Sequence, residues 1–189
     1  DIFNRVSAHK NPTAQLNWFM TKFLPWVRSQ PVEHTVLTWG NHDYCGQTLE
    51  NADLSDVTVV SDAPYTFRGL KLWLTPWSNQ FMNWAWMKPH EELARVYAEI
   101  PKGLDILVSH QPPYGCGDVY PDLVSGKPEH IGSSELLYAI ERKKPRVVIC
   151  GHLHGGHGTY QIGDTTVYNG SVLNEGYQMF YPATEIELD

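Results

Sequence analysis

Histidine follows three separate apolar runs of this sequence, and in each case it comes where the run ends. The runs and the residues after them are 35–39 followed by GNHD at 40–43, 106–109 followed by His110, and 147–150 followed by GHLH at 151–154. Short apolar runs rich in Val, Ile and Leu are typical of buried strands. Because ligands of an open α/β sheet bind outside the carboxyl ends of its strands, we expect these histidines to converge on one site.

The other segments predict helices alternating with short strands. In 12–28, apolar residues recur at helical spacing, Asn11 is suited to cap the helix, and Pro25 to kink or end it. Further helices are expected at 89–100 and 133–142, and further strands at 57–60, 65–67, 70–74 and in short segments after residue 158. The alternation favours an α/β fold, and no linker divides the chain, so we expect a single domain over 1–189. The stretch 111–132 exceeds an ordinary connection and is interpreted as functional or disordered.

Composition excludes several classes of protein. Of the 189 residues, 42% are hydrophobic and 12% aromatic, which excludes a disordered or collagen-like chain. No apolar run approaches a membrane span, and the first residues do not resemble a signal peptide. The net charge of −7, with no basic cluster beyond 142–144, argues against a nucleic acid partner. Cys45, Cys116 and Cys150 lack CxxC spacing, which indicates reduced thiols and a cytoplasmic location.

A single histidine is more often structural than functional, so position decides the interpretation. His9, His34, His90 and His130 end no apolar run, and we interpret them as structural; for His157 both roles stay open. The histidines of GNHD and GHLH, with His110, share one placement at three strands, which favours a common site. Imidazole, amide and carboxylate ligands suit divalent ions such as Zn, Mn or Fe.

These motifs, in this order, resemble the calcineurin-like metallophosphoesterase superfamily. The resemblance lies in GNHD at 40–43, His110 and GHLH at 151–154, and the start DIFNR at 1–5 is similar to that family's G-D-x-x-[DN]-R without its glycine. Residues 75–86 and 169–171 are similar to a small metallophosphoesterase-domain subfamily that includes cyclic-nucleotide phosphodiesterases. The resemblance implies an αββα sandwich with a two-metal site.

The resemblance also implies a metal ligand for each matching position. It makes Asp1 a bridge between two divalent ions, and His154 a ligand of the first ion. Asn41, His110 and His152 would complete the second ion's ligands. The metals implied are Mn, Fe, Zn or Ni, with Mn as the first expectation.

Two further residues carry implied catalytic roles. His42 would lie unligated beside the phosphate, where it donates to an oxygen or protonates the leaving alkoxide. Arg5 would clamp a phosphate oxygen, with a surface arginine as the alternative. Asn4 stands where some relatives have an Asp that orients the acid histidine. Asp43 could pair with an imidazole or merely cap a turn.

One family motif, D-x-H, occurs nowhere in the sequence. The resemblance places that motif before Asp1, together with the first sheet strands. We therefore expect an N-terminally incomplete domain rather than a natural loss. If the loss were natural, Asp1, Asn41, His110 and His152 would remain as a mononuclear site.

The resulting functional expectation is metal-dependent hydrolysis of a phosphoester by a metal-bridging hydroxide. The expected substrate is a small or nucleotide-like phosphodiester, with Trp77 and Tyr114 as substrate contacts; the tryptophans of 73–86 could equally be core. No membrane partner is expected, and the oligomeric state stays open. Alternatives are a nuclease of the same superfamily, a catalytically impaired binding scaffold, and a structural zinc protein. The last is disfavoured because closed zinc sites normally use cysteine.

Overall fold

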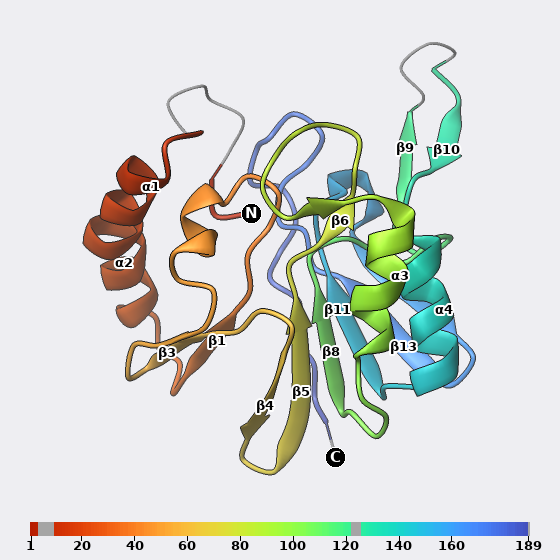
Figure 1. Ribbon diagram of the computed structural model, residues 1–189, viewed down its shortest axis with the longest axis horizontal. Coiled ribbons are helices and arrows are strands. Elements are labelled where there is room, and N and C mark those ends of the chain that lie inside the picture. Colours follow the sequence, from red (N-terminus) through yellow and green to blue (C-terminus); the bar gives the residue numbers. More distant parts are fainter. Residues whose placement is uncertain (4–9, 122–125, 189) are drawn as a thin grey trace.

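Two sheets lie face to face, and each is covered by helices on its outer side (Figure 1). The computed structural model describes residues 1–3, 10–121 and 126–188. In this part of the chain, one sheet has the strand order β1-β3-β2 and the other has β12-β13-β11-β8-β5-β4. Strands β5, β8, β11 and β13 run parallel, while β4 and β12 pair antiparallel at the two edges. The predicted α/β sandwich is thereby confirmed.

The element bounds follow the expected segments closely. The helices are α1 (Pro12–Trp18), α2 (Leu24–Arg28), α3 (His90–Ala98) and α4 (Ser134–Lys143). The strands of the small sheet are β1 (Thr35–Leu37), β2 (Ala52–Asp53) and β3 (Val57–Val59). The strands of the large sheet are β4 (Ala63–Phe67), β5 (Leu70–Thr75), β8 (Ile106–Ser109), β11 (Val147–Cys150), β12 (Gly158–Ile162) and β13 (Thr165–Asn169). Short pairs form between β6 (Ser78–Asn79) and β7 (Met87–Lys88), and between β9 (Val119–Pro121) and β10 (Pro128–His130).

The first helical segment runs through its proline instead of ending there. The Asn11 side chain accepts hydrogen bonds from two backbone N–H groups and caps α1, as predicted. A π-helical turn, Phe19–Phe23, joins α1 to α2, and the Leu24 N–H bonds to the Phe19 carbonyl. Pro25 lies in the first turn of α2, where its missing N–H is least costly. The wider π turn accommodates the proline without a break in the helix.

Alternating side chains divide the core into layers. Leu72 and Leu74 of β5 pack against Val36 of β1 and Val108 of β8, and they fill the space between the sheets. Trp73, which points to the opposite face of β5, packs under α3 and α4 instead. This period of two is what a strand buried on both faces requires. The apolar layer under the helices comprises Leu93, Tyr97, Leu136, Ala139, Ile140, Leu107, Val148 and Val167.

The stretch 111–132 contains regular structure that the sequence did not predict. Strands β9 and β10 pair antiparallel, with His130 opposite Val119, and form an arm that projects beyond the sheets in Figure 1. Of the two expected alternatives, functional or disordered, the disordered one is therefore wrong for these strands, and the functional one stays a prediction. Pro121 and Pro128 hid the pattern because proline is atypical of strands, yet both lie at strand ends, where proline is tolerated.

The three cysteines are buried and free, as expected of reduced thiols. Burial raises the pKa of the Cys45 thiol to about 12. No helix in the described residues has the length and apolar character needed to cross a membrane.

Candidate metal centre

Two neighbouring strands bring two histidines together. Strands β8 and β11 are parallel neighbours, with Val108 opposite Ile149, so their carboxyl ends lie side by side. The backbone contact continues past the strands, because Gly151 N–H donates to the His110 carbonyl at 3.1 Å. The imidazole rings of His110 and His152 consequently lie 4.6 Å apart between centroids. The predicted convergence at one sheet edge is observed for this pair.

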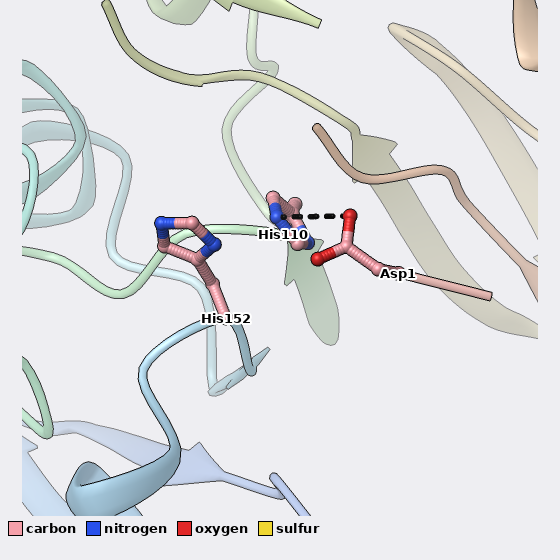
Figure 2. Close-up of side chains that lie close together, drawn as sticks. All are labelled: Asp1, His110 and His152. Carbon is pink, nitrogen blue, oxygen red and sulfur yellow. Dashed lines mark ion pairs between the residues drawn. The ribbon is translucent and has the colours of Figure 1, made fainter. Parts of the chain in front are cut away.

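The Asp1 carboxylate completes a group of three potential ligands with these two rings. One ligand atom from each of the three residues lies within 4.8 Å of the others. The Asp1 Oδ1 atom is 3.7 Å from His110 Nε2, and Figure 2 shows the side chains pointing toward one another from three separate segments. Ligands of one divalent ion sit about 2.0–2.2 Å from it, so they span no more than about 4.4 Å. Small side-chain adjustments would therefore suffice to hold one ion.

Asn41 adds an amide oxygen to this group. Asn41 is fully buried, and its Oδ1 lies 2.7 Å from His110 Nε2. Burial lowers the pKa of His110 well below its usual value, which favours the neutral ring. Because the Asn41 amide oxygen only accepts, Nε2 donates to it in this structure and the lone pair of the neutral ring lies on Nδ1. A carboxylate, two imidazoles and an amide oxygen suit a borderline divalent cation. The structure thus brings together Asp1, Asn41, His110 and His152, the set predicted for one ion.

The Asp43 carboxylate fastens the first residues of the chain to the GNHD loop. Its Oδ1 accepts from the N–H groups of Ile2 and Phe3, and its Oδ2 accepts from the N–H of Gly40 at 2.7 Å. Burial raises the pKa of Asp43, and these three backbone donors act in the opposite direction. Asp43 therefore holds Asp1 in position; it does not pair with an imidazole in any contact described here.

His152 has an unusual backbone that directs its ring. Its φ of 68° lies in the left-handed region, which is uncommon for residues other than glycine and which histidine enters more readily than most. The chain then begins a tight helical turn at His154–Gly156. The backbone at His152 is no longer extended, because strand β11 has already ended at Cys150.

His154 lines the same cavity as Asp1 and His152 but is not part of the group of three. Its Nδ1 is 2.9 Å from the carbonyl oxygen of Asn174, and its ring packs edge-on against Tyr177 at 4.9 Å. Since a carbonyl only accepts, Nδ1 carries the proton and Nε2 keeps its lone pair. The ligand role of His154 stays a prediction.

His42 lies next to the metal group with its ring against an aromatic wall. Its backbone N–H donates to Asp1 Oδ1 at 2.8 Å, while its ring is 4.5 Å from the ring of Trp84. The centroid of the Phe81 ring is 5.3 Å from that of the Trp84 ring and 6.3 Å from that of the His152 ring. We call Phe81 and Trp84 the aromatic wall, because both line the cavity described next.

An open cavity of about 1970 Å³ contains the candidate site. Its lining includes Asp1, His42, His154 and Tyr114, the last of which is 47% exposed. Trp77 is absent from the lining. Its indole N–H donates to the Asp62 carboxylate and its ring packs on Trp86 at 5.1 Å, so this tryptophan has a packing position away from the cavity.

Two predicted positions, Asn4 and Arg5, lie outside the described residues. The lining also includes residues whose role the sequence left open or interpreted as structural. Trp84 and Phe81 lie in an aromatic stretch where core and surface positions look alike, and His130 ends no apolar run. The pairing of His130 with Asp118 joins residues that share no motif, so no pattern could have found it.

Comparison with known proteins shows consistent similarities. The family model described as calcineurin-like phosphoesterase matches residues 1–156. The human and mouse proteins named metallophosphoesterase domain-containing protein 1 are each 30% identical to this chain, over 88% of the chain and 59% of the relative. A UPF0046 protein of Caenorhabditis elegans is 27% identical over 85% of this chain and 63% of its own length. The chain thus spans about three fifths of the length of the human and mouse relatives.

One solved structure is similar to this chain in its fold, and the similarity extends to the fold only. It superposes with a TM-score of 0.64 at 20% identity, over 89% of this chain and 68% of that chain.

Proposed function

Because the chain belongs to the calcineurin-like phosphoesterase family, we propose that it hydrolyses a small phosphodiester with the help of divalent metal ions. The observation that carries this proposal is the gathering of Asp1, Asn41, His110 and His152. Asp1, Asn41 and His152 line one cavity, and His110 is buried next to them. These residues come from four distant segments, and such a donor set has no evident structural purpose. The two imidazole rings and the carboxylate are the ligand types that Mn and its neighbours accept.

The bound ions would supply Lewis acidity for a phosphoryl oxygen and lower the pKa of water. The protein's own part is to hold the ligands: Asp43 positions Asp1, and burial keeps His110 neutral. For a second ion we propose Asp1 as the shared ligand and His154 as another. The Asn174 carbonyl fixes the His154 ring so that Nε2 remains available.

His42 is proposed as the proton donor to the leaving oxygen. Its backbone bond to Asp1 keeps it beside the metal group, while its ring, held against Trp84, stays outside the group of three. A positioned histidine of this kind can donate to the ester oxygen as the bond to phosphorus breaks.

The aromatic wall and the charge of the chain support a small organic ester as substrate. Phe81 is 54% exposed in the described structure, so its ring is available to a ligand in the cavity. Aromatic side chains of this kind stack on flat organic groups. The net charge of −7 disfavours a long polyanion, because phosphate-rich polymers are held by basic surfaces.

Metal-dependent turnover provides the test. Purified protein supplied with Mn²⁺ is expected to hydrolyse bis(p-nitrophenyl) phosphate, to lose this activity in EDTA, and to regain it when Mn²⁺ is restored. His110→Ala should lose both the bound metal and the turnover. His34→Ala is the matched control, since His34 bonds to Thr58 away from the cavity and should keep both. Metal-loaded protein that hydrolyses neither diesters nor monoesters would favour a binding scaffold instead.

A further inference from the structure

Asp118 is a fully buried carboxylate outside the proposed metal centre, and its two oxygens have different partners. Oδ2 accepts from the N–H groups of Gly115 and Gly132, both at 2.9 Å, and so connects the backbone at these two glycines. Oδ1 lies 2.7 Å from Nδ1 of His130. Oδ2 alone makes both of these backbone hydrogen bonds. The second oxygen is therefore committed to one side chain, His130.

This bond fixes how the His130 ring faces the cavity. Because an ionised carboxylate only accepts, the proton of the neutral ring resides on Nδ1, and Nε2 points away from Asp118 with its lone pair. The His130 side chain is 46% exposed, and the residue lines the cavity that holds the metal group. A histidine that served only to satisfy Asp118 would have no need of this exposure.

Tyr114 stands beside His130 on the same cavity wall. The two ring centroids are 5.5 Å apart, and both residues line the cavity. This part of the chain is connected directly to the metal centre, because Gln111, the residue after His110, donates from Nε2 to the Ile131 carbonyl at 3.0 Å. The Gln111 side chain thus connects the backbone next to His130 to the end of β8, where His110 lies.

We propose that His130 and Tyr114, with Asp118 as the positioning residue, form a subsite for the organic group of the phosphoester. The subsite rests on the proposed function, and it would take a flat group that carries a hydroxyl or N–H. Tyr114 offers a ring face to the flat group, and His130 Nε2 accepts a hydrogen bond from it. Asp118 keeps the imidazole in the tautomer that makes this acceptor available.

Binding of thymidine 5′-monophosphate to Mn²⁺-loaded protein tests the subsite directly. On addition of this probe, the ¹H–¹⁵N NMR signals of the His130 ring are expected to shift. His130→Ala and Tyr114→Ala should each weaken its binding about tenfold, which corresponds to about 1.4 kcal/mol. Tyr138→Ala is the matched control: Tyr138 is an exposed aromatic residue of α4 outside the cavity lining, and binding should stay within about twofold.

The variant Asp118→Asn tests whether Asp118 positions the His130 ring or only stabilises the fold. ¹⁵N shifts report which ring nitrogen carries the proton, and this variant should mix the two tautomers of His130 while binding weakens. His130→Gln, which keeps an acceptor, should recover part of the affinity lost in His130→Ala. A probe that fails to bind, or that binds with unmoved His130 signals and undiminished affinity in His130→Ala, would overturn the subsite.

Turnover of bis(p-nitrophenyl) phosphate reports on the proposed function separately. Turnover without a role for His130 in probe binding would overturn the subsite alone. Probe binding through His130 without turnover of any phosphoester would contradict the proposed function alone.

Discussion

His42→Ala is expected to lower the kcat for phosphodiester hydrolysis by about 10²–10⁴-fold, the usual contribution of a positioned general acid. The bound metal should stay, because the contact of His42 with Asp1 uses the backbone N–H, which alanine retains. The ring itself contacts Trp84 and is not part of the three-residue ligand group. Steady-state kinetics and elemental analysis of the same preparation measure both quantities.

The leaving group provides the control for this variant. An ester with an acidic leaving group, such as p-nitrophenol, needs less proton donation than an alkyl ester. The loss in His42→Ala should therefore be larger for the alkyl ester. Equal losses for both esters, or loss of metal together with activity, would assign His42 to metal binding rather than to proton donation.

Gly40→Ala is expected to weaken metal binding about 10–100-fold, the range found when the residues that support metal ligands are changed. A Cβ atom at position 40 would lie 2.4 Å from Asp1 Oδ1 and 2.4 Å from His110 Cε1. Neither neighbour can yield without leaving its place in the metal group, since the His110 ring is buried and Asp1 is held through the adjacent Asp43 bonds. Mn²⁺ titration followed by calorimetry measures the change.

Gly151→Ala is the matched control for this substitution. Gly151 also comes just before a proposed ligand, His152, yet the nearest atom to its added Cβ is Ser171 Oγ at 3.6 Å, an ordinary contact. Its metal affinity should stay close to that of the unchanged protein. If both variants lost metal equally, the tight packing of Gly40 against two ligands would not be the reason.

The sequence predicts the strand ends well because the side chains change from apolar to polar at the residue where each strand ends. Apolar runs mark β8 and β11, and the polar residue after each run is at the sheet edge where a ligand can bind. The serines at 133 and 134 are both candidates in the sequence for the cap of α4, and in the structure the Ser133 hydroxyl accepts from the Leu136 N–H. These features are local, so a single sequence contains them.

Features that depend on contacts between distant segments were not predictable. The left-handed backbone at His152 is one such feature, and no residue type in GHLH signals it. Trp77 and Trp84 have similar surroundings in the sequence, yet one packs inside and the other lines the cavity. The Asp118–His130 pair depends on how the β9–β10 arm returns to the sheet.

Anomalous diffraction from crystals of the Mn²⁺-loaded protein would locate the metal bound by the candidate ligand group. We expect a manganese peak about 2.0–2.4 Å from the Asp1 carboxylate, the Asn41 amide oxygen and a ring nitrogen each of His110 and His152. A manganese peak elsewhere in the protein, with these four side chains unligated, would contradict this expectation.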